Sequence, residues 1–113
     1  MVLAQTVWAA PSNKWRLEFS GGADSDGVIT LMLTPVGGDS VSYSTDISKG
    51  RGENGVAKDV VSSLQAQLPE DAYKVERDDG EDVLIKKRRG AADFDVLIEQ
   101  NTVKGVRINL DRE

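Results

Sequence analysis

The sequence predicts an α+β fold, namely a mainly antiparallel β-sheet or small β-sandwich of about seven strands with one amphipathic helix packed on it. Two observations carry this prediction. In residues 14–47, and again in residues 72–110, apolar and polar residues alternate, which is typical of half-buried strands. Between them, in residues 56–68, the apolar spacing changes once to that of a helix. Because a single helix cannot supply repeated crossovers, a sheet of parallel strands is excluded.

The first half of the chain is expected to form three strands. The segment KWRLEFS at 14–20 alternates without a break, and VITLMLT at 28–34 and SVSYSTDI at 40–47 follow with the same period. Pro35 ends the second of these strands or places it at a sheet edge, because proline cannot donate a hydrogen bond to the ladder. The GGD triplet at 37–39 then predicts a hairpin turn.

The second half is expected to hold the helix and four more strands. The helix covers about residues 56–68. Asn54 is the predicted N-cap, because its side chain can accept a hydrogen bond from the first turn. Pro69 ends the helix, since the residue before a proline avoids helical angles. The strand segments are AYKVER (72–77), VLIKK (83–87), FDVLIE (94–99) and VKGVRINL (103–110).

Domain organisation follows from length and charge distribution. The 113 residues suit one domain, predicted at residues 14–113, and no repeat or linker divides it. Residues 1–13 carry no charge and form an N-terminal arm in this prediction. The arm is either a frayed or packed strand, or a segment that docks on a neighbouring subunit. The possible assembly contacts are Val2, Leu3, Val7, Trp8 and Trp15, with the alternative that Trp15 belongs to the domain's own core.

Composition argues against several functions. The chain has 14 Lys and Arg against 19 Asp and Glu, so its formal net charge of −5 disfavours direct binding to nucleic acid. Histidine and cysteine are both absent, which removes the commonest general base, the thiolate nucleophile and the main soft metal ligands. No apolar run approaches the roughly 18 residues that a membrane-spanning helix needs. We therefore expect no enzyme, no catalytic residues and no membrane partner.

The stretch GRGENG at 50–55 has the G-x-G-x-x-G spacing of a dinucleotide-binding loop, and Glu76 lies near the distance of the ribose-binding acid. The context differs, because the preceding strand alternates serine with apolar residues and so has one wet face, unlike a buried parallel strand. Asp46 and Glu53 would also repel phosphate. We expect a plain strand-to-helix connection here and no cofactor.

Two other charged stretches also favour structural interpretations. GADSDG at 22–27 lacks the first and twelfth carboxylates of a calcium loop, so a turn is expected in which the aspartates bond their own backbone, and no metal site is expected. The paired acids at 78–79 and 81–82 are predicted to be solvated turn residues. The basic cluster KKRR at 86–89 has acidic neighbours on both sides, which should pair with it across adjacent strands.

One combination of segments resembles a known module. YSTDISKGRGENGVAKDVVSSLQAQL joins a Thr/Ser/Tyr strand, a glycine-rich loop and a helix, and YKVERDDGEDVLIKK and FDVLIE follow as short strands. The arrangement, over about residues 27–99, resembles a strand–loop–helix–hairpin module of structural proteins in tailed bacteriophages, including tail sheath, tube and nozzle components. The large phage proteins embed this module among other domains, whereas here it stands nearly alone.

The resemblance implies a non-enzymatic structural subunit of a phage virion or phage-like particle, as a tail, connector or head-decoration component. Its partners would be itself, as a homo-oligomer, or larger virion proteins, and its location the virion; otherwise we expect a cytoplasmic protein, because a signal-peptide basic region is missing. The alternative is a small acidic soluble binding or regulatory module, such as an adaptor or inhibitor. A carboxylate-dependent enzyme is a third and weaker alternative.

Overall fold

The computed structural model describes residues 11–113, and it confirms the predicted fold class. The described chain forms seven strands in two antiparallel sheets together with one helix. The predicted contacts Val2, Leu3, Val7 and Trp8 lie outside the described residues. The elements in chain order are β1 (Lys14–Ser20), β2 (Gly27–Pro35), β3 (Val41–Ile47), α1 (Glu53–Gln67), β4 (Tyr73–Asp78), β5 (Asp82–Lys87), β6 (Phe94–Asn101) and β7 (Arg107–Arg112).

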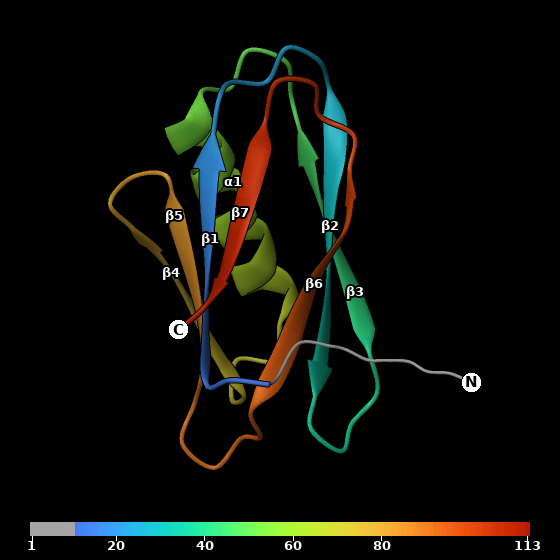
Figure 1. Cartoon of the computed structure of the whole chain (residues 1–113), viewed down its shortest axis with the longest axis vertical. Helices are drawn as coiled ribbons and strands as arrows, with labels where there is room; N and C mark the ends of the chain where they lie inside the picture. The colour runs from blue at the N-terminus through green and yellow to red at the C-terminus, as the bar shows by residue number, and fades with distance from the viewer. Residues whose placement is uncertain (1–10) are drawn as a thin grey trace, which may run out of the picture.

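The two sheets form a sandwich that the helix closes on one side. One sheet has the order β4-β5-β1-β7 and the other the order β3-β2-β6. The helix α1 contacts β1, β4 and β5 of the larger sheet and β3 of the smaller one (Figure 1). It therefore covers the side where β3 and β4 are the outermost strands. The opposite side, where β6 and β7 are outermost, has no helix among the described residues.

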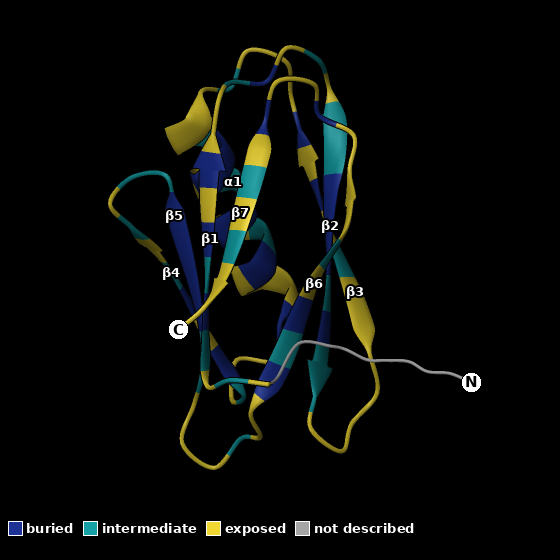
Figure 2. Ribbon diagram, in the orientation of Figure 1, coloured by how far each residue is buried: buried dark blue, intermediate teal, exposed yellow. Residues whose placement is uncertain are grey.

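The buried residues, dark blue in Figure 2, lie on strands of both sheets and on α1, and together they form one core cluster. In β1, Trp15, Leu17 and Phe19 point inward as their alternation predicts, and none is more than 4% exposed. The indole Nε1–H of Trp15 donates a 2.8 Å hydrogen bond to the backbone carbonyl of Phe94 in the other sheet. Trp15 therefore belongs to the domain's own core and links the two sheets. The helix adds the buried residues Val56, Ala57, Val60, Val61 and Leu64.

The helix begins three residues earlier than its apolar spacing predicts. Gly52 is the N-cap and makes no side-chain hydrogen bond, so the prediction that Asn54 is the cap is wrong. Arg51, just before the cap, instead ties the preceding loop to the first two turns of the helix. Its guanidinium donates to both carboxylate oxygens of Asp59, at 2.9 and 3.0 Å, and to the carbonyl of Gly55 at 3.1 Å. A bidentate pair of this kind fixes geometry more firmly than a single ion contact.

The loops before β2 and before α1 dock on each other at one end of the sandwich. The N–H of Ala23 donates to the carbonyl of Arg51, and the carbonyl of Ala23 accepts a hydrogen bond from the N–H of Gly50, both at 2.8 Å. Asp26 accepts the N–H of Lys49 through Oδ1 at 2.7 Å. The prediction that the aspartates of this turn bond their own backbone is therefore wrong for Asp26, whose partner lies on the neighbouring loop.

The loop between β6 and β7 joins the same end of the molecule. The N–H of Asp24 donates to the carbonyl of Lys104 at 2.8 Å, and the N–H of Lys104 donates to Ser25 Oγ at 3.0 Å. Gly105 has φ of +88°, and a Cβ placed on it would overlap the carbonyl oxygen of Gly22. Backbone approaches backbone so closely here that only glycine fits.

Candidate assembly surface

The outer strands β6 and β7 present edges that α1 does not cover. Both strands lie toward the viewer in Figure 1, with α1 behind them. Within residues 11–113, the only pairing on the outer edge of β6 is an isolated antiparallel bridge between Ser12 and Phe94. Free strand edges offer unpaired backbone groups and can accept another chain.

The bridge between Ser12 and Phe94 directs the start of the described chain toward this edge. The two residues exchange both backbone hydrogen bonds, each at 2.9 Å, so they form a closely spaced antiparallel pair. Ser12 Oγ also donates to the carbonyl of Glu113 at 2.8 Å. Further along β6, the N–H of Val96 bonds only locally, to Oδ1 of Asp95 at 3.0 Å. A side chain takes the place of a neighbouring strand at this position.

Apolar side chains gather beside these edges. Ile98 on β6, and Ile108 and Leu110 on β7, pack against the core but remain partly exposed. On the outer face of the smaller sheet, Leu97 is 51% exposed and lies opposite Met32. The side of the sandwich away from α1 is thus its less completely covered side.

The outer face of the larger sheet carries a lateral line of carboxylates, which we call the acidic row: Asp78 on β4, Asp82 on β5 and Glu18 on β1. Strand register places Asp78 opposite Asp82, and Asp82 opposite Glu18. Arg16 contacts Oδ2 of Asp78 at 3.1 Å and Oδ2 of Asp82 at 2.5 Å. Hydrogen bonds from the Arg16 guanidinium to Asp82, Glu113 and Asp78 raise its pKa further above its already high ordinary value.

Asp82 departs from the prediction for its turn. It is only 7% exposed, and its Oδ1 finds no hydrogen-bond partner among the described residues. The prediction of solvated turn carboxylates is wrong for this residue. Its burial follows from its position in β5, between β4 and β1, which the sequence of the turn alone does not reveal.

A second line, the basic row, crosses the same sheet: Lys74 on β4, Lys86 on β5 and Lys14 on β1. The ammonium group of each lysine in this row forms an ion pair with a carboxylate. Glu76 contacts Lys86 at 2.7 Å and Lys74 at 3.5 Å, and Glu113 contacts Lys14 at 3.6 Å. The hydrogen bond from Lys86 lowers the pKa of Glu76, despite partial burial.

The predicted pairing of the KKRR cluster with the acids beside it in the sequence is confirmed for Lys87, which lies 3.3 Å from Asp93. Lys86 pairs instead with Glu76, an acid of β4 outside the predicted set. Arg88 instead donates through Nε to the backbone carbonyl of Glu70 at 2.6 Å. The cluster is therefore largely engaged within the fold.

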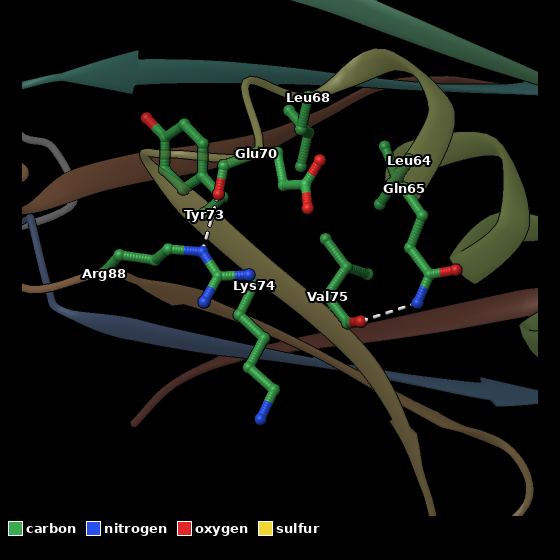
Figure 3. A pocket seen from close by; sticks show the side chains of 8 residues that line it. All are labelled: Leu64, Gln65, Leu68, Glu70, Tyr73, Lys74, Val75 and Arg88. Atoms are coloured by element: carbon green, nitrogen blue, oxygen red, sulfur yellow. Dashed lines mark hydrogen bonds between the residues drawn. The ribbon is translucent and has the colours of Figure 1, made fainter.

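A pocket of about 390 Å³ lies where the end of α1 meets β4 (Figure 3). Its apolar wall includes Leu64 and Leu68, and Arg88 and Gln65 lie at its rim, held by the hydrogen bonds drawn there. Burial raises the pKa of Tyr73, which also lines it. One carboxylate, Glu70, faces the space beside these groups, and Lys74 also lines the pocket.

The glycine loop takes the expected role of a connection. The strand before it, β3, is an edge strand of an antiparallel sheet, whereas a dinucleotide fingerprint follows a buried parallel strand. The space in front of the helix start is lined by Glu53 and Glu81 as well as by glycines. Two carboxylates at this position oppose the binding of a phosphate.

In the described residues, the fold is a small α+β sandwich with α1 on one side; on the other side, the outer edges of β6 and β7 pair with no further strand apart from the bridge to Ser12. No protein-family model matches the chain, and no curated protein matches it at a significant level. In the described part of the chain, no helix is long and apolar enough to cross a membrane.

Proposed function

We propose that this chain is a non-enzymatic structural subunit that works by assembly, with the virion of a bacteriophage or a phage-like particle as its setting. The observation that carries the assembly proposal is the outer edge of β6, where Phe94 pairs with Ser12 and, within residues 11–113, no further strand pairs. The setting rests on the resemblance of about residues 27–99 to the phage module. Partners are further copies of the chain or larger virion proteins.

The N-terminal segment is the part of the chain that we propose makes the contact. In the assembly, the uncharged segment of one copy, together with its Ser12, adds as a strand to the β6 edge of a neighbouring copy, in place of that copy's own Ser12 and in the register of the Ser12–Phe94 pair. This register would place Ala10 opposite Val96 and Trp8 opposite Ile98. The added strand would cover the partly exposed apolar groups beside β6 and satisfy its free backbone groups.

The register gives a matched pair of proline substitutions. Hydrogen-bonded and non-hydrogen-bonded pairs alternate along an antiparallel ladder, so in the proposed strand the N–H of Ala10 would point toward β6 and that of Ala9 would point away. Ala10→Pro should reduce assembly, since proline removes that donor. Ala9→Pro, with the same change one residue away, should be tolerated far better.

Light scattering after size-exclusion chromatography measures the outcome, with negative-stain images of the largest species. We expect rings, tubes or a defined oligomer for the wild type and a smaller species after removal of residues 1–10, with unchanged circular dichroism. Equal effects of the two proline variants would contradict strand addition. A wild-type chain that stays monomeric at high concentration would favour the second candidate, an acidic binding or regulatory module, which the net charge of −5 supports.

A further inference from the structure

The acidic row has fewer counter-charges than the basic row. Each lysine of the basic row has a carboxylate within 4.0 Å. The acidic row has Arg16 as its cation, and Arg16 also pairs with Glu113, which lies outside the row. Glu18 forms no side-chain hydrogen bond or ion pair within residues 11–113, although it lies directly opposite Asp82. Like charges directly opposite on neighbouring strands destabilise a sheet unless something intervenes.

Glu81, which is not part of the acidic row, forms a cluster of three carboxylates with Glu18 and Asp82. Glu81, in the turn between β4 and β5, places a carboxylate oxygen within 4.8 Å of one from Glu18 and one from Asp82. The backbone holds this turn against β1, since the N–H of Phe19 donates to the carbonyl of Glu81 at 3.0 Å. The three carboxylates thus come from two adjacent strands and the turn between β4 and β5.

Asp82 supplies an independent sign that a cation belongs here. Its side chain is nine-tenths buried, and Oδ2 is bound by Arg16 while Oδ1 is buried without a partner in the described structure. A buried, unpartnered carboxylate oxygen is costly. Arg16 would act as the outer hydrogen-bond donor that orients a ligating carboxylate, an arrangement common around bound metals.

We propose that Glu18, Glu81 and Asp82 bind a calcium ion, with Oδ1 of Asp82 as one ligand. Carboxylate oxygens are the ligands that hard divalent cations take, and no softer side chain is available here. Magnesium demands near-ideal octahedral geometry and gives up its waters reluctantly, whereas calcium accepts several carboxylates in a flexible geometry. Three carboxylates that come from two strands and a turn therefore suit calcium better than magnesium.

The ion would join the turn between β4 and β5 to β1, so its binding should stabilise the fold. Open sites of this kind bind calcium with dissociation constants of about 0.1–1 mM. At 10 mM CaCl₂, and at ionic strength matched with NaCl, we expect a saturable rise in Tm of about 5 °C or more. An equal rise with MgCl₂, or none beyond the NaCl control, would overturn the calcium site.

Two neutralising substitutions test the ligands. Glu18 is exposed and Glu81 half-exposed, so both variants should fold. Glu18→Gln and Glu81→Gln should each abolish most of the calcium response. Without calcium, Glu18→Gln should raise Tm slightly, since it removes a like charge beside Asp82. Asp46→Asn is the control: it makes the same charge change at an exposed position on β3 and should keep the full response. Loss of the response in Asp46→Asn, or its survival in Glu18→Gln, would refute the assignment.

Discussion

Arg16 and Asp82 form an ion pair between β1 and β5 although they are not direct cross-strand partners. Arg16 lies opposite Leu84, and its guanidinium reaches diagonally to Oδ2 of Asp82 at 2.5 Å. The arginine is 23% exposed and the aspartate 10% exposed at their side chains, so water screens this pair less than most surface pairs. The diagonal contact compensates part of the repulsion within the acidic row.

Removal of this arginine should therefore destabilise the domain. Arg16→Ala leaves the buried carboxylate of Asp82 without its cation, and we expect a loss of about 2–3 kcal/mol in the free energy of unfolding. Arg77→Ala is the matched control, because Arg77 is exposed on the neighbouring β4; it should cost less than about 0.5 kcal/mol. Urea unfolding of both variants measures the difference, and similar losses would contradict the role assigned to Arg16.

Acid should weaken the fold through the carboxylates of Glu76 and Glu113. Hydrogen bonds from Lys86 and from Arg16, respectively, lower the pKa of these two groups below the ordinary value near 4.5. Because the folded-state pKa is depressed, their stabilising contribution is present above pH 4.5 and is lost as the pH falls through the folded-state values. Tm should decline below about pH 4.5, and the decline should be shallower in Glu76→Gln. An unchanged profile in that variant would argue against the Glu76 contribution.

Gly105 tests how tightly the loops pack at the end of the sandwich. Gly105→Ala imposes a left-handed backbone angle on a residue with a Cβ and drives that Cβ into the carbonyl of Gly22, so we expect a loss of about 3 kcal/mol. Gly37→Ala shares the positive φ of +79° but points into open space, and should cost only about 1 kcal/mol. The difference in thermal or urea unfolding isolates the steric contribution; equal losses would exclude it.

The bidentate contact of Arg51 with Asp59 should help to hold the start of α1. The side chains of Arg51 and Asp59 are 40% and 32% exposed, so we expect Arg51→Ala to cost only about 1 kcal/mol. A double-mutant cycle with Asp59→Ala measures the coupling directly. Additive losses in the double variant would mean that the two side chains do not stabilise each other.

The environment of Trp15 can be checked by fluorescence. In a Trp8→Phe variant, Trp15 is the one remaining tryptophan of the chain, and its burial at 4% exposure predicts a blue-shifted emission that moves to the red on unfolding. Trp15→Phe removes the indole donor to Phe94 and should cost about 1 kcal/mol or more. Red emission from the folded Trp8→Phe variant would contradict the core position.

Local sequence pattern determined the class of fold, because the period of apolar residues decides which face of a strand or helix can be buried. The alternation in KWRLEFS predicted the inward direction of Trp15, Leu17 and Phe19, and Pro69 marked the end of the helix within two residues. The helix start was missed, because its N-cap is Gly52, which has no capping side chain, and because the buried apolar residues of the helix begin only at Val56.

The tertiary structure alone decided which polar groups meet. In the sequence, Asp82 is one of several acidic residues near a turn. Pairing of β5 with both β4 and β1 buries Asp82 and places it between Asp78 and Glu18. The position of β6 at the edge of its sheet in the described structure likewise follows from strand order, since β6 pairs with β2, about 60 to 70 residues earlier in the chain. The physical reason is that periodicity reports how a segment divides between apolar and polar faces, whereas contacts between charges depend on the register of strands that are distant in sequence.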